Sequence, residues 1–135
     1  MYLSLLNEKQ KESFMDLAYL LSSVDGDFSD EEQMVMDSYL GELGISYDYE
    51  ANAKTLDAAI GHLLSNGCDE SDKKVILFEL VSLAMSDENF DQNEKAFIER
   101  LCVSFGFESG FYLQCEAALK AYLEAQDRLS ALILY

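Results

Sequence analysis

No proline occurs anywhere in this chain of 135 residues, and only seven glycines do, so few positions can interrupt a helix. All-β folds depend on these two residues at their turns, whereas long helices exclude them. Half of the residues are apolar, which supplies enough material for one packed core in a chain of this length. The sequence therefore predicts a single all-α domain over residues 1–135.

Apolar residues at helical spacing divide the chain into successive helices. The first is expected to begin after Asn7, which forms a capping box with Gln10, and to run to about Ser23. A second is expected to begin at Ser29 and to end at Gly44, with its apolar positions turned to the core. Those positions are Met34, Val35, Met36, Tyr39, Leu40 and Leu43. Further helices are predicted over 49–64, from about 71 to 85, after the cap at 91–94 and over 109–124.

Two of these segments have unusual apolar patterns. The stretch from Val75 to Met85 is apolar nearly all round, which is typical of a helix buried in the middle of a domain. At the C-terminal end, a break is expected near Gln126, before Leu129, Leu132, Ile133, Leu134 and Tyr135. We expect this apolar end to dock on the core, because exposed apolar patches are uncommon in monomers. The alternative is a free amphipathic segment that binds a partner or a second copy.

An internal repeat relates residues 14–45 to residues 76–107. A shift of 62 residues aligns five identical pairs and also superposes apolar positions. A helix pair cannot close its own core, so the two units are expected to pack about a pseudo-twofold axis with their acidic turns close together. The identical pairs are Leu21 with Leu83, Asp25 with Asp87, Phe28 with Phe90, Glu32 with Glu94, and Gly44 with Gly106.

The two acidic turns form a candidate site for a divalent cation. Their side chains offer oxygen donors, which hard cations such as calcium and magnesium prefer. Neither turn is an EF-hand, because Asp30 and Gln92 stand where the invariant glycine belongs, and Met36 and Ile98 where the bidentate glutamate belongs. An ion would therefore be bound weakly or shared between the turns. The candidate ligands are Asp25, Asp27, Glu32, Asp87, Asn89, Asp91 and Glu94.

Helix capping is the alternative explanation for part of this acidic set. Ser29 with Glu32, and Asp91 with Glu94, have the spacing of capping boxes, and acids near a helix N-terminus interact favourably with its dipole. Capping does not account for Asp25 and Asp87, which follow a helix C-terminus. These two residues are thus the strongest functional hint in the acidic turns. The alternative is that each accepts amide hydrogen bonds within its own turn, as in an Asx turn.

The net charge of −17 limits the classes of partner. Nine basic residues against 26 acidic ones create a field that repels phosphate backbones and anionic lipids, so neither nucleic acid nor membrane is expected to bind. A cation or a protein with a basic surface is favoured, although acidity also serves solubility. Three widely spaced cysteines are expected to be reduced thiols, and neither a leader nor a membrane span is expected from the apolar pattern. We expect a cytoplasmic monomer or weak dimer.

Catalysis is not expected from the residue pattern. His62 is the only histidine and has no serine or cysteine at a recognisable nucleophile spacing. Zinc is poorly served for the same reason, since one histidine and three scattered cysteines do not make a ligand motif. Tyr47 and Tyr49, which flank Asp48 in a predicted loop, are instead candidates for exposed protein contacts.

The segment from Ala18 to Glu32 resembles the tellurite-resistance TerB family, whose mark is an apolar helix ending in Asp-Gly-x-apolar and followed shortly by a glutamate. Residues 87–94 match this mark more loosely, because Glu88 replaces its glycine. The resemblance implies a bundle of about seven helices, a link to tellurite and general stress resistance, and acidic surfaces proposed to bind divalent metal. It also implies relatives attached to co-chaperones, and no enzymatic activity.

The sequence thus favours a non-enzymatic, TerB-like binding or scaffold module that acts through its acidic surface on a basic partner or a cation. A divalent-cation binding protein proper, using the paired acidic turns, is the alternative. A small acidic enzyme is a third class, which would require a concave pocket with perturbed carboxylates.

Overall fold

The computed structural model describes residues 2–24, 30–48, 54–85, 92–108 and 110–134. Within these ranges the protein is all-helical and contains no strand, which confirms the predicted fold class. The described elements are one short 3-10 helix and six α-helices, where the sequence predicted about seven helices. They are η1 (Leu3–Leu5), α1 (Glu8–Ser22), α2 (Asp30–Leu43), α3 (Leu56–Ser65), α4 (Glu70–Met85), α5 (Gln92–Phe105) and α6 (Phe111–Leu134).

The helix starts follow from short polar residues that accept the first backbone amides. At α1 the predicted capping box is present: Gln10 N donates to Asn7 Oδ1 at 2.8 Å, and Asn7 N donates to Gln10 Oε1 at 3.0 Å. α3 begins after Thr55, later than predicted, because the Thr55 hydroxyl oxygen accepts the amide of Ala58 at 3.2 Å. The N-cap residues predicted for the next two acidic segments, Ser29 and Asp91, lie outside the described residues.

α2 and α5, the helices that the internal repeat pairs, end in the same way. Gly44 and Gly106 adopt φ of 68° and 77°, a left-handed conformation that glycine enters without a steric penalty. The next amide then closes back on the helix, with Ile45 N donating to Leu40 O at 3.4 Å and Phe107 N donating to Cys102 O at 3.0 Å. The predicted end of α2 at Gly44 is confirmed, whereas the pseudo-twofold axis stays a prediction.

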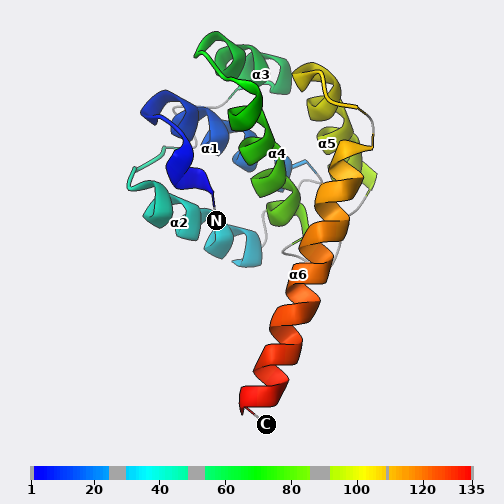
Figure 1. Cartoon of the computed structure of the whole chain (residues 1–135). Coiled ribbons are helices and arrows are strands. Elements are labelled where there is room, and N and C mark those ends of the chain that lie inside the picture. The colour runs from blue at the N-terminus through cyan, green and yellow to red at the C-terminus, as the bar shows by residue number, and fades with distance from the viewer. Residues whose placement is uncertain (1, 25–29, 49–53, 86–91, 109, 135) are drawn as a thin grey trace.

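α4 lies at the centre of the bundle, as its apolar sequence predicted. It contacts α1, α5, α6 and η1, and Figure 1 shows it running between α1 and α5. Since neighbours cover it on several sides, its apolar residues are buried around most of its circumference. Its buried apolar side chains are Ile76, Leu77, Leu80, Val81, Leu83 and Ala84.

One acidic residue, Glu79, lies within the apolar run of this central helix, where it binds the N-terminal segment of the chain. Glu79 is buried, and its Oε1 accepts the backbone amide of Tyr2 at 2.7 Å. Its backbone carbonyl accepts the hydroxyl of Tyr39 at 3.1 Å, which connects α4 with α2. Burial, followed by the charges of Glu79 and Glu42, raises the pKa of Tyr39, so this phenol remains a hydrogen-bond donor.

A second buried acid holds the segment between α2 and α3 against α1. Asp16 is only 2% exposed, Lys54 Nζ lies 3.0 Å from its Oδ2, and the Tyr47 hydroxyl donates to its Oδ1. Tyr47 is therefore half-buried and faces this carboxylate, so its interpretation as an exposed protein contact is wrong. Tyr49, the other tyrosine of that prediction, lies outside the described residues.

Two predictions about apolar faces are wrong. Met34, predicted in the core, is 71% exposed, because the helical period of α2 places it on the side opposite Met36. The predicted break near Gln126 is absent, and α6 continues as one helix to Leu134. Its residues 120–134 are all exposed instead of docked, and Figure 1 shows this part of α6 projecting beyond the other helices.

Candidate functional site

The structure describes two of the seven predicted cation ligands. Glu32 and Glu94 lie in the first turns of α2 and α5, and both are 5% exposed. The other five, Asp25, Asp27, Asp87, Asn89 and Asp91, lie outside the described residues. Among the residues that are described, no three histidine, cysteine or acidic side chains gather in a manner that could hold a metal ion. The described glutamates alone therefore do not make a metal site.

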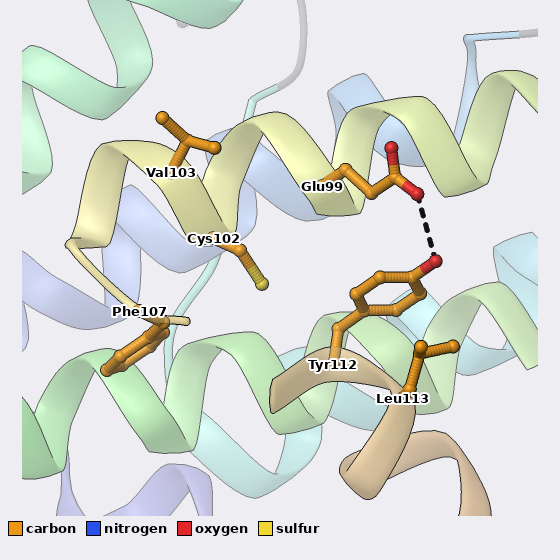
Figure 2. A pocket seen from close by; sticks show the side chains of 6 residues that line it. All are labelled: Glu99, Cys102, Val103, Phe107, Tyr112 and Leu113. Carbon is orange, nitrogen blue, oxygen red and sulfur yellow. Dashed lines mark hydrogen bonds between the residues drawn. The ribbon is translucent and has the colours of Figure 1, made fainter. Parts of the chain in front are cut away.

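A groove lies between α5 and α6. Its volume is about 450 Å³, and both helices contribute side chains to it (Figure 2). Four of its six lining residues are apolar, and the other two are a glutamate and a tyrosine. The α5–α6 groove is lined by Glu99, Cys102, Val103, Phe107, Tyr112 and Leu113.

The groove exists because the chain reverses sharply between the two helices. The positive φ of Gly106 ends α5 and turns Phe107 toward the aromatic rings that flank it. The Phe107 ring lies 5.9 Å from that of Phe105 and 4.8 Å from that of Phe111, centroid to centroid. This aromatic cluster fixes the start of α6 beside the end of α5 and forms one end of the groove.

One polar contact spans the groove. The hydroxyl of Tyr112 on α6 donates to Glu99 Oε1 on α5 at 2.9 Å, drawn as a dashed line in Figure 2. Burial, then the hydrogen bond to Glu99, raises the pKa of Tyr112, so the phenol stays protonated at neutral pH.

The rim of the groove is apolar and open to solvent. Val103 on α5 is 77% exposed and Leu113 on α6 is 52% exposed, and both line the groove. Scattered exposed apolar residues are common, but two that border one concave surface mark a candidate contact site. This groove is not predictable from the sequence, because its two walls are outer faces of different helices and only their packing brings them together.

The cysteines of this region are poorly suited to nucleophilic chemistry. Burial raises the pKa of Cys102 to about 11, and burial likewise raises the pKa of Cys115. The pKa of Cys68 is also raised to about 11, by burial and then by the charge of Asp72. A thiol attacks as its thiolate, so these values leave little of the reactive form at neutral pH.

A serine and a histidine approach each other elsewhere in the fold. Ser13 Oγ on α1 lies 3.3 Å from Nδ1 of His62 on α3, a contact that the sequence spacing did not indicate. Ser13 is completely buried, so a substrate has no route to its hydroxyl. The contact serves the packing of α1 against α3 better than it serves a reaction.

Comparisons of the chain with protein-family models, with curated proteins and with solved structures found no match. None of the helices that the structure describes is both long enough and apolar enough to cross a membrane.

Proposed function

We propose that this protein is a non-enzymatic binding module of the TerB-like type, which holds a basic amphipathic segment of a protein partner in the α5–α6 groove. The observation that carries this proposal is the exposed apolar rim, Val103 and Leu113, on a chain of net charge −17. We place this activity in the cytoplasm and in a stress-related setting, the latter on the resemblance to the TerB family alone.

Acidic side chains surround the groove and define the charge of its occupant. Glu99 lines it, and the charges of Glu99 and Glu116 both act on Tyr112. A neighbouring cavity of about 350 Å³ shares Phe107 with the groove and is lined by two acids, Glu70 and Glu108, and one base, Lys74. An apolar groove with acidic surroundings complements a helix that carries leucines on one face and lysines beside them.

Titration with designed peptides tests this proposal. We expect a helical peptide with leucines at i, i+3, i+4 and i+7 and lysines elsewhere to bind, and its glutamate counterpart not to bind. The double variant Val103→Gln and Leu113→Gln should weaken binding by about tenfold or more, because it removes apolar contacts without changing the charge. Fluorescence anisotropy of the labelled peptide measures the affinity.

Met34→Gln is the matched control, since Met34 is also strongly exposed but lies on α2, away from the groove residues. It should leave the affinity unchanged. If the double variant also leaves the affinity unchanged, the peptide responds only to the overall charge, and the groove proposal is abandoned.

The second candidate function is divalent-cation binding by the paired acidic turns. Glu32 and Glu94 occupy equivalent repeat positions directly after these turns, and both are buried. A buried carboxylate is costly unless hydrogen bonds, a counter-charge or a metal ion compensate it. Helix capping would supply such compensation, and so would calcium or magnesium shared between the turns.

Thermal unfolding with calcium or magnesium against chelator distinguishes these explanations. A cation that binds only the folded state at 100 times its Kd adds about 2.7 kcal/mol of stability, so we expect a saturable rise in Tm. Asp25→Ala or Asp87→Ala should each abolish the rise. Sodium chloride at equal ionic strength is the control for screening of the acidic surface. A rise no larger than that in sodium would leave these acids as caps and solvated surface.

A further inference from the structure

The C-terminal part of α6 has an apolar helical face that no other described part of the chain covers. Residues 120–134, the α6 tail, are all exposed and extend for about 22 Å at the rise of an α-helix. Leu132 and Ile133 are 82% and 75% exposed, and Figure 1 shows the tail leaving the bundle as a straight continuation of α6. Six large apolar residues lie exposed on it: Tyr122, Leu123, Leu129, Leu132, Ile133 and Leu134.

The tail continues the same helix face that α6 buries against its own core. Tyr112, Cys115 and Leu119 are the buried residues of α6, and they are spaced by three and four residues. The same alternation of three and four extends this row through the tail, as in a coiled coil. The positions in the extension are Tyr122, Gln126, Leu129 and Ile133.

The row passes over an apolar pocket where the tail leaves the bundle. This pocket has a volume of about 220 Å³, and Ala118, Leu119 and Tyr122 form its α6 side. Tyr2 and Phe78 form the rest, with their rings edge to face at 5.7 Å. The face therefore has two parts, an exposed apolar helix and, at its base, a concave apolar pocket.

We propose that the α6 tail of a second copy covers this face, in an antiparallel pair of tails. In the antiparallel register that places heptad positions opposite one another, Gln126 faces Leu129 of the second copy. Tyr122 then faces Ile133 of the second copy, at the pocket. The end of each tail thus fills the pocket of the other copy, and the interface is self-complementary about a twofold axis.

The distribution of charge favours a second copy and fixes the orientation of the pair. The tail carries Lys120 and Arg128 against Glu124 and Asp127, so its formal charge is zero, and the remainder of the chain carries the entire −17. Two tails can therefore meet without repulsion. A parallel pair would bring the two acidic bundles side by side, whereas an antiparallel pair separates them by about 22 Å, several screening lengths at physiological salt.

The available area makes this a weak dimer. A helix with its side chains is about 10 Å wide, so one half-face of the tail covers about 350 Å² and a pair of tails about 700 Å². The two filled pockets add to this area. The area between the helices alone lies below the roughly 1,200 Å² at which stable specific interfaces begin, so we expect a weak, transient dimer with a Kd of micromolar order or higher.

Sedimentation equilibrium of the full chain tests the proposal. The protein concentration would run from about 1 to about 200 μM, so that it covers a micromolar Kd. We expect a monomer–dimer equilibrium that Leu129→Glu shifts to monomer by at least tenfold in Kd, because it puts a charge in the apolar row. Ala131→Glu, the same charge change on the opposite face of the tail, should leave the equilibrium nearly unchanged. Both residues lie on the exposed tail, so both variants should fold, as circular dichroism would verify.

Cysteine crosslinking tests the orientation. A mixture of Tyr122→Cys chains with Ile133→Cys chains should form disulfide-linked heterodimers on mild oxidation, and neither variant alone should do so. Crosslinking within each variant alone would indicate parallel tails and would overturn the proposed register. A chain that stays monomeric throughout, or a dimer that Leu129→Glu does not weaken, would overturn the proposal as a whole. Because the test uses no peptide, its result is independent of the α5–α6 groove.

Discussion

Replacing Lys54 by methionine is expected to lower the free energy of unfolding by about 3 kcal/mol, at the lower end of the range for a broken buried ion pair. The loss arises because Asp16, whose side chain is 1% exposed, keeps its charge but loses the ammonium 3.0 Å away. The lower end applies because the Lys54 side chain is 24% exposed and water can partly replace it. Urea unfolding followed by circular dichroism measures the change.

Lys74→Met is the matched control, since its ion pair with Glu70 spans 3.5 Å between two largely exposed side chains. Exposed pairs of this kind contribute at most about 1 kcal/mol, so the control should unfold at nearly the wild-type urea concentration. Adding Asp16→Asn to Lys54→Met should recover part of the loss, because it removes the uncompensated charge. Equal effects of Lys54→Met and Lys74→Met would show that Asp16 does not depend on Lys54.

This ion pair shows where the sequence stops being informative. Asp16 lies among the apolar residues of α1, and its position suggested neither burial nor a partner. Its two partners, Tyr47 and Lys54, lie more than 30 residues further along the chain. The sequence interpretation placed Tyr47 on the surface, since a polar residue in a loop gives no local sign of a buried carboxylate elsewhere.

The features that sequence predicted well are those that short-range chemistry determines. The Asn7 capping box, the helix end at Gly44 and the all-round apolar run of α4 each depend on residues a few positions apart. The α6 tail was mispredicted for the opposite reason. Whether an apolar helix end docks depends on a complementary face elsewhere, and the bundle closes its core without the tail.

The two candidate sites differ in the same way, since one follows from a local sequence pattern and the other from packing between helices. The seven cation ligands were chosen from a local repeat, and the structure describes only Glu32 and Glu94 of them, both buried in first turns. The α5–α6 groove was not predicted, because Val103 and Leu113 form one surface only when the turn at Gly106 places α6 beside α5. A sequence signal did exist, namely exposed apolar residues at positions where the helical period expects polar ones.

Truncation of Leu80 to alanine should cost about 2 to 5 kcal/mol of stability, as expected when a fully buried leucine leaves a cavity. Leu80 is completely buried in α4, which contacts α1, α5 and α6, so no single neighbour can move to fill the space. Met34→Ala, at a strongly exposed site on α2, should change stability by no more than about 0.5 kcal/mol. Urea midpoints of the two variants provide the comparison. Similar small losses in both would mean that α4 is not the centre of a tightly packed core, and the α5–α6 groove would then lack the rigid support that its binding role requires.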